Sequence, residues 1–228
     1  MLLKMQSVLG RTVITRDRKI RLIEDFLVDD QTWSLRFLKA NLGRWFGRQS
    51  VLIPTMLLQS DTDEKRPIPV ELTSEEMRHC FRSSFLEAID GRYRLLFDHR
   101  SCPARFWSSK PNGDTAVTHT FDLQKISADA AEGSHLRSVR ELLGYHIVGN
   151  DGEAIAAVAD LEVDSVSWGV RKIVVQIGAG IFSSRATICP ACVEGISPMR
   201  MSIQVDGTQD SFNWRGHSQF PSGAISRS

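Results

Sequence analysis

ADLEVD, residues 159–164, is followed by Trp168 four residues later, and this pattern occurs twice in the chain. The earlier copy is EDFLVD at residues 24–29, followed by Trp33 at the same spacing. The match extends on both sides, with only two single-residue insertions, through Leu9-Gly10 and Leu143-Gly144, Asp17 and Asp151, Arg36 and Arg171, Gly43 and Gly178, and Pro54 and Pro190. Self-similarity at nearly constant spacing indicates one structural unit that is used twice.

Each copy has the patterns of short strands. Apolar residues alternate with other residues at Leu38, Ala40 and Leu42 in the first copy and at Ile173, Val175 and Ile177 in the second. A period of two is typical of a half-buried strand. The interval from Asp29 to Trp33, like that from Asp164 to Trp168, predicts a hairpin loop, and Asp151-Gly152 predicts another turn. We therefore expect an all-β protein with minor helices, in which each copy forms a small barrel.

Two short helices are expected between the strands. Ser138 and Glu141 have the spacing of a helix-capping pair, and Gly144 follows as a stop signal. Thr73 and Glu76 offer a similar cap for a helix that would run to about Phe81. These signals divide the chain into a first repeat (residues 1–72), a partly helical connector (73–133), a second repeat (134–206) and a mobile C-terminal tail (207–228).

The repeated unit resembles the PRC-barrel domain, the small β-barrel of the photosynthetic reaction centre H subunit and the ribosome maturation factor. The resemblance is carried by HLRSVRELLGYHI at 135–147, NDGEAIAAVADLEVD at 150–164 and SWGVRKIVV at 167–175, and residues 7–58 repeat it. One departure is Arg18, which stands where the Asp-Gly turn has its glycine. The resemblance implies a tandem PRC-barrel protein that acts as a non-enzymatic binding or scaffolding module.

Cys189-Pro-Ala-Cys192 has the spacing of a thioredoxin-like redox pair, which would need a thiol of lowered pKa at a helix start. The repeat aligns these residues with Ile53, Pro54 and Met56, which instead favours small apolar residues on a strand. A zinc site would require further ligands, and the sequence offers only the loose pairs His79-Cys80 and His99-x-x-Cys102. We expect no metal and no cofactor.

The acidic residues that recur at the turns could act as paired carboxylates for acid–base catalysis or cation binding. They are Glu24, Asp25, Asp29 and Asp30 in the first copy and Asp160 and Asp164 in the second. Because they occupy turn positions in both copies, a role in accepting backbone N–H groups is the favoured interpretation. Trp33 and Trp168 are expected to fill the core. We predict no catalytic residue and no enzymatic activity.

Charge is distributed unevenly along the chain, although the 228 residues carry a formal net charge of only +1. Residues 1–60 contain ten Lys and Arg against five Asp and Glu, whereas residues 134–206 contain six against eight. In the basic first repeat, Arg44, Trp45, Phe46 and Arg48 form the candidate interaction surface. This cluster could bind a protein partner or mediate self-association, could lie in a solvated loop, or could bind RNA or an anionic membrane.

Composition bounds the remaining possibilities. The chain is 42% hydrophobic and 24% charged, and it has no apolar run long enough to span a bilayer and no signal-peptide pattern. Four cysteines in a chain of this length do not suggest a disulfide framework. We expect a cytoplasmic protein-interaction module with a protein partner or a second copy as its ligand. The alternative is an RNA- or ribosome-associated factor that uses the basic first repeat, and a redox role for Cys189 and Cys192 comes third.

Overall fold

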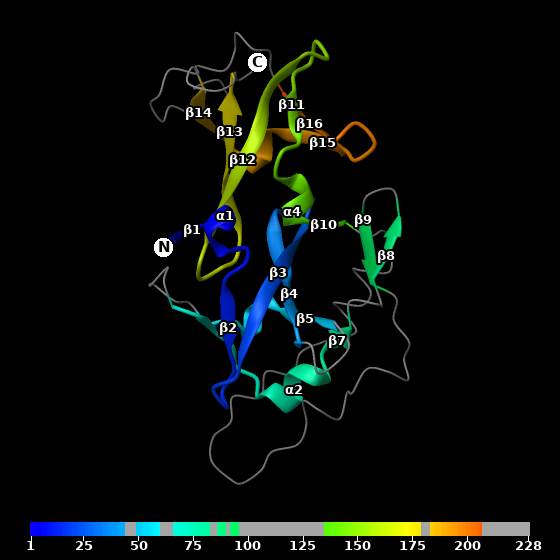
Figure 1. Cartoon of the computed structure of the whole chain (residues 1–228). Coiled ribbons are helices and arrows are strands. Elements are labelled where there is room, and N and C mark those ends of the chain that lie inside the picture. The colour runs from blue at the N-terminus through cyan, green and yellow to red at the C-terminus, as the bar shows by residue number, and fades with distance from the viewer. Residues whose placement is uncertain are drawn as a thin grey trace, which may run out of the picture.

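The computed structural model describes residues 1–43, 49–59, 66–82, 86–89, 92–95, 135–178 and 183–206. Within these residues the fold is mostly β, as expected, with two sheets and only short helices. The two sheets form the two ends of an elongated molecule (Figure 1). None of the described helices is long and apolar enough to cross a membrane.

The first sheet is built mainly from the first repeat. Its strands are β2 (Thr12–Ile14), β3 (Ile20–Asp29), β4 (Ser34–Asn41), β5 (Ser50–Pro54), β6 (Ile68–Pro69), β7 (Phe81–Arg82), β8 (Leu86–Ile89), β9 (Arg92–Leu95) and β10 (Leu136–Ser138). They run in the order β7-β5-β4-β3-β10-β9-β8, and β2 pairs with both β3 and β6.

The second sheet repeats this arrangement with the second repeat. Its strands are β1 (Leu2–Lys4), β11 (His146–Val148), β12 (Ala154–Asp164), β13 (Val170–Ile177), β14 (Ser184–Ile188), β15 (Val193–Ser197) and β16 (Ser202–Val205). They run in the order β14-β13-β12-β11-β16-β15, with β1 also paired to β12. In both sheets the long strand (β3 or β12) pairs with the next strand of its hairpin (β4 or β13). A short strand (β2 or β11) lies between the long strand and another short strand (β6 or β16), to which it runs parallel. The described strands close neither sheet into a barrel.

The strand that precedes the first helix of each repeat pairs with the other repeat. β1 lies antiparallel to the end of β12, with Leu3 opposite Val163. β10 lies antiparallel to the end of β3, with Arg137 opposite Val28. These are equivalent positions of the two copies, so the repeats exchange strands reciprocally, and each sheet takes one strand from the other repeat.

The short helices begin where the sequence predicts them. α4 (Val139–Leu142) is capped by Ser138, whose Oγ accepts a hydrogen bond from the backbone N–H of Glu141 at 3.1 Å. α1 (Met5–Val8) occupies the same place in the first repeat. α2 (Ser74–Arg78) has a complete capping box formed by Thr73 and Glu76. The prediction that α2 reaches Phe81 is wrong, because Phe81 begins β7 and pairs with Leu52 of β5.

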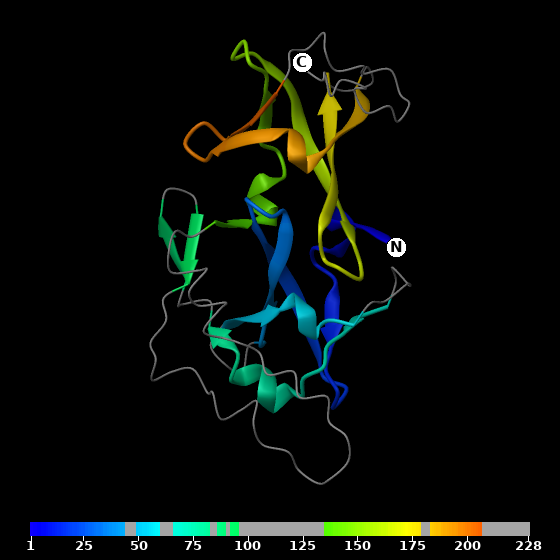
Figure 2. The same cartoon turned by 180° about the vertical axis from the view of Figure 1, so that it is seen from behind.

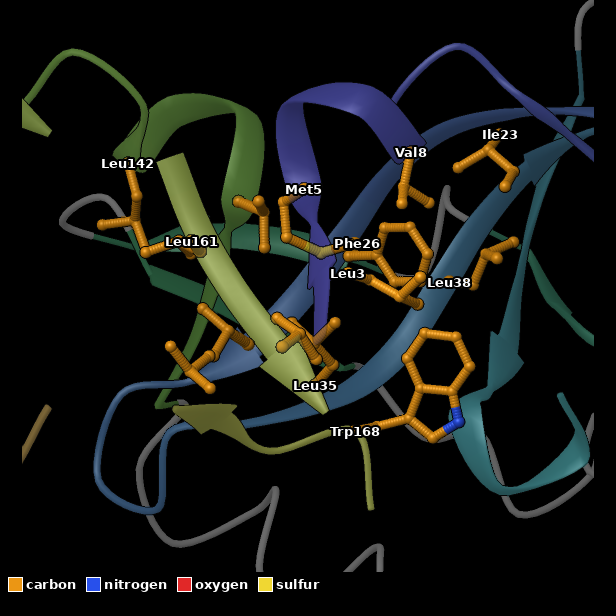
Figure 3. Packing of buried hydrophobic residues seen from close by; sticks show 14 of the residues in the cluster. Leu3, Met5, Val8, Ile23, Phe26, Leu35, Leu38, Leu142, Leu161 and Trp168 are labelled. Atoms are coloured by element: carbon orange, nitrogen blue, oxygen red, sulfur yellow. The ribbon is translucent and has the colours of Figure 1, made fainter. Parts of the chain in front are cut away.

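One hydrophobic core spans both repeats. It contains Leu3, Met5 and Phe26 from the first repeat together with Leu161 and Trp168 from the second. Figure 3 shows these side chains packed beneath α1 and α4. The rings of Phe26 and Trp168 stack with their centroids 6.0 Å apart. Because the two copies share this core, burial stabilises their contact as well as each copy.

The predicted turn in the β2–β3 hairpin keeps its geometry despite the missing glycine. Gly152 adopts a positive φ of 81° between β11 and β12, and Arg18 adopts a φ of 59° at the equivalent position between β2 and β3. A left-handed conformation is unfavourable for a residue that has a Cβ atom, whereas glycine adopts it without this cost. The hydroxyl of Thr15 helps to hold this turn, because it accepts a hydrogen bond from the N–H of Lys19 at 2.9 Å.

Candidate interaction surface

The recurring carboxylates Asp25 and Asp160 each cap the first helix of the other repeat. Asp25 Oδ1 accepts the N–H of Arg140 at 3.1 Å, and Asp160 Oδ1 accepts the N–H of Gln6 at 2.9 Å. Asp25 also accepts a hydrogen bond from the hydroxyl of Ser138. Burial raises the pKa of Asp25, and these hydrogen bonds oppose the rise. Both aspartates therefore bind backbone N–H groups, as the sequence interpretation favoured, and they do so across the repeat boundary. The prediction that they occupy turns is wrong, because Asp25 lies within β3 and Asp160 within β12.

The second pair of recurring carboxylates stabilises the Asp-x-x-x-Trp turns. Asp29 Oδ1 accepts the backbone N–H groups of Gln31 and Thr32, both at 3.0 Å. Asp164 accepts the N–H of Val166 at 3.1 Å and a hydrogen bond from Arg171 at 3.0 Å. These hydrogen bonds lower the pKa of Asp164 to about 2. The carboxylates therefore belong to local turn structure.

The tips of the two Asp-x-x-x-Trp turns bind each other. The carbonyl of Trp33 accepts the N–H of Val170 at 2.7 Å, and the carbonyl of Trp168 accepts the N–H of Leu35 at 2.8 Å. Both tryptophans are buried, as predicted. Both lie in the Asp-x-x-x-Trp turns, because β4 begins only at Ser34 and β13 only at Val170.

A buried ion pair distinguishes one exchanged strand from the other. Arg137 on β10 is only 2% exposed, and its Nε donates to Asp30, whose side chain is 8% exposed. His135 and Arg92 also face Asp30, at 3.2 Å and 3.5 Å. The equivalent positions on the other side of the molecule are Leu3, which is buried, and Ser165. The ion pair therefore belongs to one of the two otherwise equivalent junctions.

The Cys-x-x-Cys segment lies at a 3₁₀ turn. Cys189 immediately precedes the 3₁₀ helix η5 (Pro190–Cys192), just as Pro54 precedes η2 (Thr55–Leu57) in the first repeat. The structure thus matches Cys189 with Pro54, one residue away from the sequence alignment, which matches it with Ile53. The prediction that both cysteines lie on a strand is wrong, because β14 ends at Ile188. Both thiols are half-buried and free, and burial raises the pKa of Cys192. This shift is opposite to that of a thioredoxin-type nucleophile.

The residues considered as metal ligands do not assemble into a described cluster. Cys80 lies just beyond α2, where burial raises the pKa of its thiol to about 12. The imidazole of neighbouring His79 lies 3.6 Å from Glu75. In the described ranges there is no group of three or more residues that could hold a metal ion. His99 and Cys102 lie outside those ranges.

The candidate surface formed by Arg44, Trp45, Phe46 and Arg48 also lies outside the described residues. The same repeat, however, has a second surface that sequence reasoning missed. On β3, Ile20 and Leu22 point outward and remain 53% and 48% exposed. Their cross-strand neighbours on β2 are Ile14 and Thr12, and Pro69 of β6 lies opposite Ile14 on the other side.

Basic residues border these apolar side chains at the turn between β2 and β3. Arg16, Arg18 and Lys19 are all exposed there. Asp17 in the same turn points to α2, where it accepts hydrogen bonds from Ser74, and these together with the one from Thr15 hold the pKa of its carboxyl well below the usual range. We call this surface the basic face; it consists of Ile14, Ile20, Leu22 and Pro69 with Arg16, Arg18 and Lys19.

The equivalent surface of the second repeat has the opposite character. The cross-strand pair Ile14–Ile20 is replaced by Val148–Ala154, and Thr12–Leu22 is replaced by His146–Ala157. The turn between β11 and β12 carries exposed Asp151 and Glu153, and Asn150 joins it to exposed Asp206 through a hydrogen bond of 3.1 Å. We call this surface the acidic face; it consists of His146, Val148, Ala154 and Ala157 with Asp151, Glu153 and Asp206.

Repeat equivalence is the signal that could have identified both faces from the sequence. The repeat alignment matches Ile20 with Ala154, and it matches Arg18 and Lys19 with Gly152 and Glu153. Alternation alone could not do so, because it predicts which side chains share a face and not which face stays uncovered.

No protein-family model matches the chain, and no curated protein matches it.

Proposed function

We propose that the chain is a non-enzymatic interaction module, built from two PRC-barrel-type repeats, whose basic face binds a protein partner. The repeat patterns and their resemblance to the PRC-barrel domain support the choice of fold family. The reciprocal use of Asp25 and Asp160 as backbone caps supports a structural role for the recurring carboxylates.

The observation that carries the proposal is the exposure of Ile20 and Leu22 next to a basic turn. Because Ile20 and Leu22 are already about half buried, covering the rest of both side chains with a partner contributes about 1.5–3 kcal/mol before the costs of association. The second repeat has alanines at the equivalent positions, and its two strands still pair antiparallel, with a register shift between Ile147 and Val148. The fold therefore does not require large apolar residues there, which favours a role in binding.

Affinity capture with matched variants tests this function. The tagged chain is compared with Ile20→Ser/Leu22→Ser, and with Ala154→Ser/Ala157→Ser as the control at equivalent positions of the second repeat. We expect a defined protein, or a second copy that carries the same substitutions as the tagged one, to be captured by the wild type and the control but not by the first variant. Capture of the same proteins by all three would contradict the proposal, as would turnover of a substrate by the purified chain.

A second candidate function is binding of RNA or a ribosomal component. The excess of ten basic over five acidic residues in residues 1–60 favours it. RNA binding would weaken steeply with salt and would be reduced by Arg16→Ala, Arg18→Ala and by Arg44→Ala, Arg48→Ala. The described part of the basic face favours protein over RNA, because its exposed apolar residues are aliphatic and single-stranded RNA is bound by aromatic stacking.

A further inference from the structure

The basic and acidic faces are complementary in charge. Arg16, Arg18 and Lys19 border the first, and Asp151 and Glu153 border the second, together with Asp206. Both faces are formed by the same pair of strands in the two repeats, so their charged turns are placed equivalently relative to the sheet. Bringing one face onto the other would set cations opposite carboxylates.

The two faces are also complementary in side-chain size. Ile20 and Leu22 project from the basic face, whereas Ala154 and Ala157 leave the equivalent positions of the acidic face shallow. Sheets pack face to face when large side chains of one layer meet small ones of the other. Two basic faces would instead bring like charges and large side chains together, and two acidic faces would bring carboxylates together.

We propose that the basic face of one copy packs on the acidic face of a second copy, so that the chains associate head to tail. This inference rests on the proposed function and names the partner as the chain itself. A second copy is favoured over another protein because the structure contains both halves of the contact.

The position of the faces determines what such an association builds. The β2–β3 turn and the β11–β12 turn lie at opposite ends of the molecule, as the front and back views both show (Figures 1 and 2). A contact between two different faces leaves one free face on each outer copy. Association can therefore continue beyond two copies, to an open chain or, where the rotation between copies closes, to a ring.

Sedimentation velocity of the full chain over a wide concentration range tests the proposal. We expect the weight-average sedimentation coefficient to rise with protein concentration, and the rise to be smaller at 1 M salt than at 0.05 M salt, because salt screens exposed charges. A wild type that sediments as a monomer at every concentration would overturn the proposal.

Variants of each face make the test specific. Ile20→Asp places a carboxylate on the basic face, and Asp151→Lys with Glu153→Lys reverses the acidic turn. Each should lower the association constant by more than about tenfold, since each replaces a favourable contact by a repulsive or desolvated charge. Val166→Asp is the control, because Val166 is 71% exposed but belongs to neither face. Circular dichroism checks that all variants are folded.

Mixing the two variants gives the sharpest outcome. Each retains one intact face, so a 1:1 mixture should form dimers in which the Asp151→Lys/Glu153→Lys chain contributes its basic face. Association that is unaffected by either variant, or that is insensitive to the acidic turn alone, would overturn the proposal. If the wild type is monomeric and still captures another protein through Ile20 and Leu22, the head-to-tail inference fails and the proposed function stands. If the wild type is monomeric and also captures no protein through Ile20 and Leu22, both the head-to-tail inference and the proposed function fail.

Discussion

Trp33 and Trp168 adopt left-handed backbone conformations, with φ of 51° and 55°, which cost a bulky residue about 1–2 kcal/mol each. In this conformation each tryptophan makes one contact through its backbone and another through its side chain. The carbonyl of each tryptophan accepts an N–H from the other repeat, and the indole is buried in the shared core. These contacts between the repeats offset the free-energy cost of the left-handed conformation.

Replacing Trp168 should reveal how much this boundary contributes. Trp168→Ala removes the stacking on Phe26 and leaves a cavity in the core. We expect the free energy of unfolding, measured in urea, to fall by about 3–5 kcal/mol. Val166→Ala on the same turn should change it by less than about 0.5 kcal/mol, because Val166 is exposed. Equal effects of the two substitutions would show that the boundary is not a core.

The carboxyl of Asp164 should make stability depend on pH in the acid range. Its folded-state pKa is lowered to about 2 from an ordinary value of 3.8. An acid with a lowered pKa stabilises the fold above its unfolded pKa, and this contribution is lost as pH falls through the folded one. Wild-type stability should therefore fall between about pH 4 and pH 2, and Asp164→Asn should lose part of that dependence in urea unfolding at each pH.

The carboxyl of Asp25 should make stability depend on pH in the opposite direction to that of Asp164. Burial raises its pKa, so the folded state keeps the proton at pH values where the unfolded state has lost it. Its contribution to stability is full below pH 3.8 and decreases as pH rises above that value. Asp25→Asn should flatten the pH dependence above pH 4. If both asparagine variants changed the profile in the same pH window and direction, these assignments would be wrong.

At the level of elements, the sequence predicted what depends on neighbours along the chain. The Asp-x-x-x-Trp spacing predicted both hairpins, and the Ser138 and Thr73 caps predicted the starts of α4 and α2. The strand exchange was not predicted. β1 and β10 have three residues each, and so short a strand contains no information about its partner. The end of α2 was missed because pairing with β5 outweighs local helix propensity at Phe81.

The candidate interaction surface that the sequence predicts lies outside the described residues, so it is not tested. The sequence indicated a basic first repeat, and the exposed Arg16, Arg18 and Lys19 agree with this. Its particular residues, Arg44 to Arg48, stay a prediction, whereas Ile20 and Leu22 were overlooked. Exposure of an apolar strand residue depends on whether another layer covers that side of the sheet, and this is a property of the whole fold.

The two exchanged strands should differ in how they tolerate substitution. Arg137→Leu copies the residue at the equivalent position, Leu3, but leaves Asp30 buried with fewer partners. We expect it to lower the free energy of unfolding by about 3 kcal/mol. Asp30→Ser/Arg137→Leu reproduces the Ser165–Leu3 arrangement and should recover much of this loss. A double-mutant cycle in urea measures the coupling, and additive effects would show that the ion pair is not a unit.

The whole molecule combines near-symmetry inside with asymmetry outside. The equivalent residues Asp25 and Asp160, like Trp33 and Trp168, make reciprocal contacts across one core. The β2–β3 and β11–β12 turns, in contrast, carry opposite charge at the two ends. Duplicated units that must fold together retain their interior contacts, whereas their exposed residues are free to diverge. This distribution is the reason that we assign stability to the inner turns and binding to the ends.

The shared interior leads to a prediction about the folding unit. Each sheet includes a strand from the other repeat, and one core contains Leu3, Phe26, Leu161 and Trp168. Residues 1–114 and 115–228, produced as separate polypeptides, should therefore each be largely unfolded, because each lacks the strand and indole that the other supplies.

Mixing the two polypeptides should restore the fold. We expect the circular dichroism and tryptophan fluorescence of the intact chain to reappear at equimolar ratio, and the intact chain to unfold in a single transition. A mixture in which one fragment carries Trp168→Ala should reassemble less tightly, whereas Val166→Ala should not change reassembly. Two fragments that fold separately, or two transitions in the intact chain, would mean that the exchanged strands and the stacked tryptophan are additions to two independent domains.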